Sequence, residues 1–131
     1  MVTVTRRFSF DAAHHLPHYD GKCHNLHGHT YVLDVTVTGE VSFDKNDPKQ
    51  GMIIDFGDLK KIVNDNVVER YDHQNLNKFF ENPTAECMVM FIGEMIEQLL
   101  PEGVHLVCAK LWEKYPSSYA TYIPAVDIEE M

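Results

Sequence analysis

The 131-residue sequence lacks the features that define several classes of protein. It has only three cysteines, an odd number, and they lie far apart, so we expect no disulfide framework and a reducing compartment. No apolar run approaches the roughly 18 residues of a membrane span. The start of the chain has no apolar segment behind basic residues, which argues against a secretory signal. We therefore expect a cytoplasmic protein that does not enter a membrane.

Basic residues are also few, with 11 Lys and Arg against 20 Asp and Glu, and the formal net charge is −9. Such a chain lacks the basic footprint of a nucleic-acid-binding protein and is disfavoured at anionic membranes, so neither partner is expected. Hydrophobic residues make up 44% and charged residues 24%, as in globular proteins. The length fits a single domain over residues 1–131.

Hydrophobic periodicity predicts six elements in this domain. They are strands at 2–10 and 31–38, helices at 56–70 and 83–99, and strands at 104–113 and 119–126. Asp55 is the expected N-cap of the first helix, and Pro83 suits the first helical position of the second. The order ββααββ predicts an α+β fold, with an antiparallel four-stranded sheet and two helices on one face. Residues 11–26 are expected to be irregular, and residues 127–131 to form a frayed tail.

Histidine is the residue in unusual supply, with eight in the chain. Six of them lie between positions 14 and 29, namely His14, His15, His18, His24, His27 and His29. Because His27 and His29 are two apart on a strand, their side chains share a face. An antiparallel neighbouring strand brings a third histidine to them, and the parity of Phe8 and Phe10 favours His14, with His15 as the alternative. Three histidines with an open fourth position are typical of catalytic zinc.

Other residues near these histidines, or at the ends of elements, are candidates for catalysis and binding. Cys23 lies four residues before His27, where a nearby cation would favour the reactive thiolate. Asp72 precedes His73, and a carboxylate can orient an imidazole base, although such a pair is also an ordinary loop feature. Glu113 ends a strand on its apolar parity and could accept from the ring N–H and amine of a guanine or pterin. A solvated glutamate is the alternative there.

Six ordered motifs, spanning about residues 5–123, resemble those of the 6-pyruvoyl-tetrahydropterin synthase family. They lie at residues 10–17, 23–29, 51–56, 72–77, 82–86 and 112–113. The spacing between Cys23 and the His27-Gly28-His29 triplet is similar to that of the bacterial branch, the 6-carboxy-tetrahydropterin synthases (QueD).

The resemblance implies a site and an assembly. The implied roles are zinc ligation by His14, His27 and His29, catalysis by the Cys23 thiol with Asp72 and His73, and pterin anchoring by Glu113. The implied fold is the T-fold, in which trimers close their sheets into a barrel and two trimers stack as a homohexamer. Active sites then lie between subunits, so that the thiol and the Asp72-His73 pair can come from different chains.

The implied reaction is a lyase reaction on a small-molecule pterin. It converts 7,8-dihydroneopterin triphosphate to 6-carboxy-5,6,7,8-tetrahydropterin, with release of acetaldehyde and triphosphate, as in queuosine biosynthesis. A pyruvoyl-forming or other side-chain-cleaving enzyme, and a non-catalytic zinc- or pterin-binding homologue, remain alternatives.

The sequence departs from the family pattern at Lys114, where Thr is common, at Tyr115 before Pro116, and in a longer 40–51 connection. An acidic chain that accepts a triphosphate needs local basic groups. The candidates are Lys22, Arg6, Arg7 and Lys114.

Overall fold

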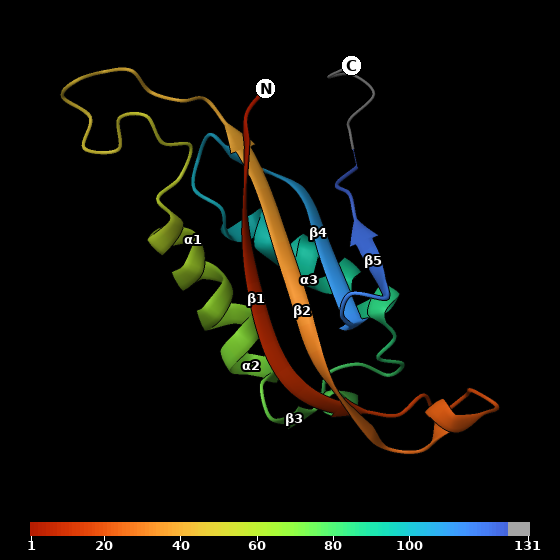
Figure 1. Cartoon of the computed structure of the whole chain (residues 1–131). Coiled ribbons are helices and arrows are strands. Elements are labelled where there is room, and N and C mark those ends of the chain that lie inside the picture. The colour runs from red at the N-terminus through yellow and green to blue at the C-terminus, as the bar shows by residue number, and fades with distance from the viewer. Residues whose placement is uncertain (126–131) are drawn as a thin grey trace.

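The computed structural model describes residues 1–125 and shows one five-stranded sheet with helices on a single face (Figure 1). The strands are β1 (Thr3–His14), β2 (His27–Gly39), β3 (Gln74–Asn75), β4 (Val104–Lys114) and β5 (Ser118–Tyr122). Their order across the sheet is β3-β1-β2-β4-β5. The four long strands pair antiparallel, and β3 adds a two-residue parallel edge to β1. The α+β prediction is confirmed, with one short strand more than expected.

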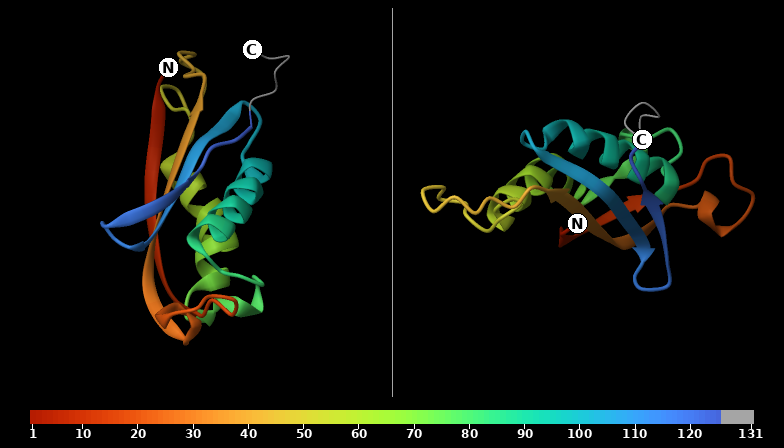
Figure 2. Two further views of the ribbon diagram at one scale, coloured as in Figure 1. Left: turned by 90° about the vertical axis from the view of Figure 1, so that its right-hand side faces the viewer. Right: turned by 90° about the horizontal axis from the view of Figure 1, so that it is seen from above.

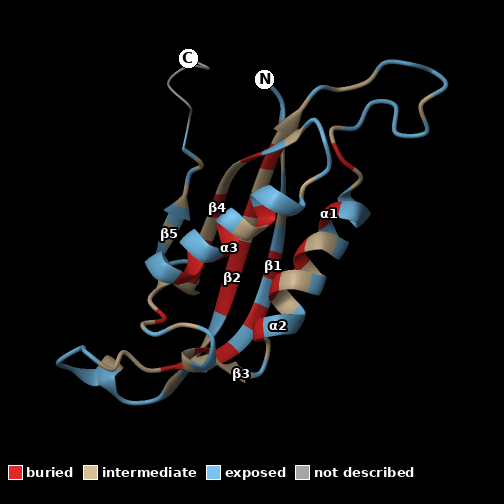
Figure 3. Ribbon diagram, turned by 180° about the vertical axis from the view of Figure 1, so that it is seen from behind, coloured by how far each residue is buried: buried red, intermediate tan, exposed pale blue. Residues whose placement is uncertain are grey.

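The helices are α1 (Phe56–Val63), α2 (Glu69–Tyr71) and α3 (Ala85–Leu99). Turning the molecule shows them stacked behind the twisted sheet as a second layer, while the other face of the sheet carries no helix among residues 1–125 (Figure 2). The core lies between the layers and contains alternate residues of β1 and β2, among them Phe10, Tyr31 and Leu33 (Figure 3). Because alternate strand residues face opposite sides, the expected parity of both strands holds.

Both long helices begin at a side-chain cap. Asp55 caps α1 as expected, since its carboxylate accepts a hydrogen bond from the Gly57 N–H. The start of α3 was wrongly expected at Pro83. Thr84 is the cap, and its hydroxyl accepts from the Cys87 N–H at 3.1 Å, so the helix begins at Ala85.

The predicted helix over 56–70 is interrupted. A turn of π-helix at Asn64–Val68 separates α1 from α2, which ends at Tyr71. The wider turn accommodates an extra residue, and the chain leaves α2 with Tyr71 fully buried and the next residues directed to the end of β1.

The strands also differ in length from the prediction. β1 continues through residues 11–14, which were expected to be irregular, because each pairs with a residue of β2 from His27 to Thr30. β5 ends at Tyr122, and the expected continuation to Val126 and the expected tail at 127–131 reach beyond the described residues. Within residues 1–125, no helix has the length and apolarity to span a membrane.

Candidate active site

The register of β1 against β2 brings three imidazoles together. His14 pairs directly with His27, and Ala12 pairs with His29, so all three histidine side chains lie on the helix-facing side at the same end of the sheet. The ring centroids are 4.6–5.0 Å apart, and one nitrogen from each ring lies within 4.8 Å of the others. His14 is almost completely buried, whereas His27 and His29 are partly exposed.

Backbone carbonyls determine which nitrogens point into this histidine cluster. Nδ1 of His14 lies 2.7 Å from the Pro83 carbonyl oxygen, and Nδ1 of His27 lies 2.7 Å from that of Asn25. A carbonyl can only accept, so both Nδ1 atoms carry the proton and both Nε2 atoms present a lone pair. These two Nε2 atoms are 3.1 Å apart, so their lone pairs converge on one point, where a shared cation would offset their repulsion. Nε2 of His29 is buried and has no hydrogen-bond partner among the described residues.

The surroundings also favour the uncharged form of His14 and of His29. Burial lowers the pKa of His14. Burial, followed by the charges of His14, His27 and Lys114, lowers the pKa of His29 to about 4. Metal-binding histidines are neutral and donate their outer N–H to a carbonyl or carboxylate. The cluster therefore has the donor set and the supporting contacts of a site for a divalent cation.

His15, the alternative third histidine, lies outside the cluster. Its backbone N–H donates to the Asn77 side-chain oxygen at 2.9 Å, and its carbonyl accepts from the Asn77 amide at 3.0 Å. This two-bond contact between the end of β1 and Asn77 fixes the backbone next to His14. His18 and His24 are exposed in the connection between β1 and β2.

The Asp72-His73 pair lies beside β1, on the connection from α2 to β3. One Asp72 oxygen is 3.0 Å from His73 Nδ1, and the other accepts the Asp11 N–H at 2.9 Å. The His73 N–H donates to the Asp11 carbonyl at 2.6 Å, and His73 has a φ of +58°. The Asp11 N–H and then His73 lower the pKa of Asp72, so it is a carboxylate at neutral pH.

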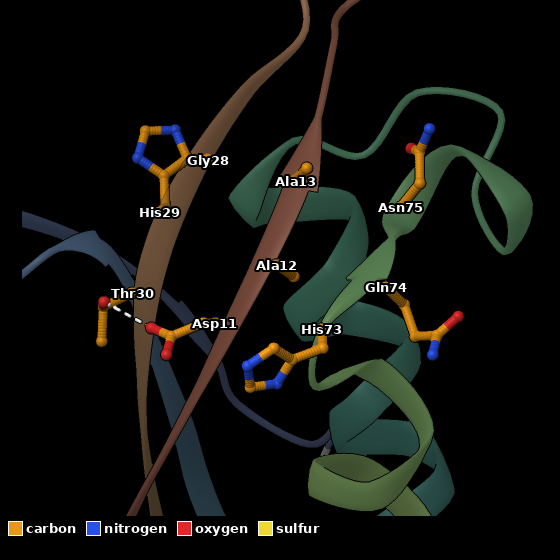
Figure 4. Close-up of a pocket in the computed structure, with 9 residues that line it drawn as sticks. All are labelled: Asp11, Ala12, Ala13, Gly28, His29, Thr30, His73, Gln74 and Asn75. Carbon is orange, nitrogen blue, oxygen red and sulfur yellow. Dashed lines mark hydrogen bonds between the residues drawn. The ribbon is translucent and has the colours of Figure 1, made fainter.

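Asp11 and His73 border a pocket of about 550 Å³ on the open side of the sheet, which we call the His73 pocket (Figure 4). The view shows His73 next to β1, with Asp11 and Thr30 hydrogen-bonded across the two strands. His29 of β2 is also among the residues that line this pocket, so the pocket shares one residue with the histidine cluster. His73 is highly exposed, with 78% of its side chain accessible.

Cys23 and Glu113 border a different pocket, of about 470 Å³, which we call the Cys23 pocket. Cys23 lies on a 3₁₀ turn (Lys22–His24) and Glu113 near the end of β4. Burial and then the charge of Glu86 raise the pKa of Glu113. Neither Asp72 nor His73 borders this pocket, so one chain joins Cys23 with Glu113 but not with the Asp72-His73 pair.

Glu86 is a site residue that the sequence analysis did not single out. It lies in the first turn of α3 and borders the Cys23 pocket together with Glu113. Its position in the 82–86 motif was the available signal, but its proximity to Glu113 depends on the packing of α3 against β4.

Comparisons with known proteins converge on one family. A family described as 6-pyruvoyl tetrahydropterin synthase matches residues 3–125. A Pyrococcus furiosus protein named dihydroneopterin monophosphate aldolase is 45% identical over 110 residues, covering 84% of this chain and 88% of the relative. A 6-carboxy-5,6,7,8-tetrahydropterin synthase of Haemophilus influenzae is 37% identical, and the match covers 93% of this chain and 99% of the relative. The solved structure of the 6-pyruvoyl tetrahydropterin synthase of Caenorhabditis elegans is 33% identical in sequence and has a TM-score of 0.79. The match covers 95% of this chain and 96% of that one.

Proposed function

This chain belongs to the 6-pyruvoyl tetrahydropterin synthase family of enzymes, and we propose that it cleaves the side chain of a phosphorylated dihydroneopterin. The specific proposal is conversion of 7,8-dihydroneopterin triphosphate and one water to 6-carboxy-5,6,7,8-tetrahydropterin, with release of acetaldehyde and triphosphate. The Haemophilus influenzae relative carries the name of this activity, and it aligns with nearly the whole chain. The structural observation behind the proposal is the convergence of three imidazoles close to Glu113, which borders the same pocket as Cys23.

The metal in this proposal is Zn²⁺, held by His14, His27 and His29. Bound there, zinc would act as a Lewis acid on the hydroxyl groups of the pterin side chain. The carbonyls of Pro83 and Asn25 would hold two of the ligand rings in their metal-binding orientation.

The Cys23 pocket would hold the pterin ring. In its ionised form, Glu113 would accept hydrogen bonds from a ring N–H and the exocyclic amine, while Glu86 lies close enough to provide a second acceptor. A ring bound at Glu113 would lie near the histidine cluster, because His27 and Glu113 are close enough for their charges to interact. The Cys23 thiol at the same pocket would then move a proton to or from the side-chain carbon.

Asp72 and His73 complete the proposed acid–base set from a neighbouring subunit. Within one chain His73 borders the His73 pocket, and neither Asp72 nor His73 borders the Cys23 pocket. We propose a homohexamer of two trimers, in which each trimer closes its sheets into a barrel. Closure removes the exposed edges of β3 and β5, which otherwise present unpaired backbone groups.

A second candidate is supported by the Pyrococcus furiosus relative, whose name is dihydroneopterin monophosphate aldolase and whose identity to this chain is 45%. An aldolase would break the bond between the first and second side-chain carbons. The products would be 6-hydroxymethyl-dihydropterin and glycolaldehyde phosphate. The same imidazole cluster and thiol could serve this reaction, so the substrate and products must distinguish the two.

Mass spectrometry of the products is the deciding test. Zinc-loaded protein is incubated separately with dihydroneopterin triphosphate and dihydroneopterin monophosphate, with the Cys23→Ala variant as control. Acetaldehyde and a 6-carboxy product from the triphosphate support the proposal, whereas glycolaldehyde phosphate from the monophosphate supports the aldolase. An intact three-carbon side chain on the product would instead identify a pyruvoyl-forming enzyme. Absence of turnover with both substrates would contradict catalysis of this kind.

A further inference from the structure

The pockets around the histidine cluster differ in the charge of their linings. The His73 pocket contains the Asp11 carboxylate, and the Cys23 pocket contains those of Glu86 and Glu113. A third pocket, of about 690 Å³, lies between β2 and the β4–β5 turn; we call it the Lys114 pocket. Its lining includes His29, Thr30, Glu113, Lys114, Tyr115 and Ser117. Of these three pockets, as lined by the described residues, only this one contains a lysine or arginine.

Lys114 has no carboxylate partner within residues 1–125, where the ion pairs involve other residues. It is exposed at the end of β4 and borders the same pocket as His29. An unpaired ammonium near a site for an anionic substrate is available to bind a phosphate oxygen.

The other basic residues considered for phosphate binding either form other contacts or do not border these pockets. Arg7 forms a two-bond pair with Asp34, at 2.7 and 2.9 Å, which neutralises its charge. Arg6 donates to the Phe56 carbonyl at the start of α1, away from the histidine cluster. Lys22 is next to Cys23 but borders none of the three pockets.

Arg7 instead contacts Tyr115, whose hydroxyl is a second hydrogen-bond donor available to a phosphate. Its guanidinium donates to the Tyr115 hydroxyl oxygen at 2.9 Å and lies over the Tyr115 ring, 4.8 Å from the centroid. Because this bond uses the oxygen as an acceptor, the hydroxyl proton of Tyr115 remains available to donate. By contrast, the hydroxyls of Thr30 and Ser117 already donate to Asp11 and to the Lys114 carbonyl.

We propose that Lys114, together with the Tyr115 hydroxyl, binds the phosphate of the substrate and so contributes to its specificity. The inference rests on the proposed function, because it takes the substrate to be a phosphorylated pterin. His29 belongs to both the histidine cluster and the Lys114 pocket, and Glu113 borders both the Lys114 and Cys23 pockets. A pterin anchored at Glu113 with its hydroxyls at the cluster therefore extends its phosphate towards Lys114.

Binding of inorganic triphosphate to the zinc-loaded protein, measured by calorimetry, tests the proposal without turnover. Lys114→Ala should weaken binding about tenfold, the effect of losing one charge-assisted contact, and Tyr115→Phe about threefold. Lys114→Arg should retain most of the affinity. Lys110→Ala is the matched control: it removes an equal charge from β4, where Lys110 packs over the Tyr119 ring, and should leave the affinity unchanged.

Steady-state kinetics give the second measurement. Lys114→Ala should raise KM for the phosphorylated pterin substrate about tenfold and leave KM for unphosphorylated dihydroneopterin unaltered. Equal triphosphate affinity in Lys114→Ala and the unmodified protein would overturn the proposal, as would an equal loss in Lys110→Ala. If the product assay finds no turnover but Lys114→Ala still weakens triphosphate binding, the phosphate site stands and the proposed reaction fails.

Discussion

The histidine cluster and the acid–base groups are built in different ways. The cluster depends on one pair of adjacent strands, since the register of β1 on β2 and two carbonyl contacts determine where its rings point. Cys23 lies on a connecting turn, and the Asp72-His73 pair lies beyond α2 at another pocket. A rigid strand ladder can therefore hold the proposed ligand set within one chain, whereas the proposed acid–base set combines groups that one chain keeps apart.

The largest effect should come from breaking the cluster. His27→Ala removes one of the two lone pairs that face each other at 3.1 Å and should abolish metal retention. Turnover should fall roughly 10⁴-fold, because a Lewis-acid metal supplies several kcal/mol of transition-state stabilisation. Elemental analysis of natively purified protein measures the metal. His24→Ala removes an exposed histidine from the same connection and should retain it; equal metal contents in the two variants would remove His27 from the ligand set.

Removing the thiol should distinguish the role of Cys23 in turnover from the role of the histidine cluster in metal binding. Cys23→Ala should lower turnover roughly 10³-fold, within the range for a lost proton-transfer group, and should leave the metal content unchanged. Cys87→Ala, at an exposed position on α3, serves as the control and should be fully active. Retained turnover in Cys23→Ala would show that the thiol takes no part in the reaction.

A smaller loss is expected from Asp72→Asn, roughly 10²-fold, because the amide cannot stabilise a protonated His73. Mixing then tests whether the site is shared. Oligomers reassembled from Cys23→Ala and Asp72→Asn chains should regain activity, since some sites combine an intact thiol from one chain with an intact Asp72-His73 pair from another. Activity no higher than that of the separate variants would place both groups in one chain.

The smallest effect is on stability, and it concerns the cluster without metal. The pKa of His29 is about 4 in the folded protein, below its ordinary value of 6.5. Between these values the unfolded chain binds the proton and the folded chain does not, so stability is complete above pH 6.5 and falls as the pH drops towards 4.

For chelator-treated protein, the shift corresponds to roughly 3 kcal/mol, and solvent screening of the partly exposed ring reduces the expected loss over that interval to about 2 kcal/mol. Urea unfolding at several pH values measures it. His29→Gln should show a smaller fall, because the glutamine side chain does not titrate. An identical fall in both proteins would mean that His29 is not desolvated as its burial implies.

The sequence allowed the most direct prediction where a feature depends on strand parity. Alternation from Phe8 and Phe10 put His14 on the same face as His27 and His29, and the structure brings these three rings together. The extension of β1 through residues 11–14 was missed, because Asp and Ala favour strands weakly and these residues are held by pairing with β2.

Features that depend on contacts between distant elements could not be predicted. The proximity of Glu86 to Glu113 results from α3 packing on β4, and the Asp11 contacts with Asp72 and His73 join residues about sixty positions apart. The left-handed backbone conformation of His73 could not be read from the sequence, because histidine adopts that conformation only occasionally.

The π-helical turn at Asn64–Val68 constrains how the length of this chain can vary during evolution. Each residue of an α-helix turns the chain by about 100°, so losing one residue here would rotate everything that follows. Asp72 and His73 would then point away from Asp11, their anchor on β1. The 40–51 connection projects beyond the sheet and does not position Asp72 or His73 (Figure 1). Insertions and deletions among homologues should therefore accumulate in that connection and be rare between residues 64 and 73.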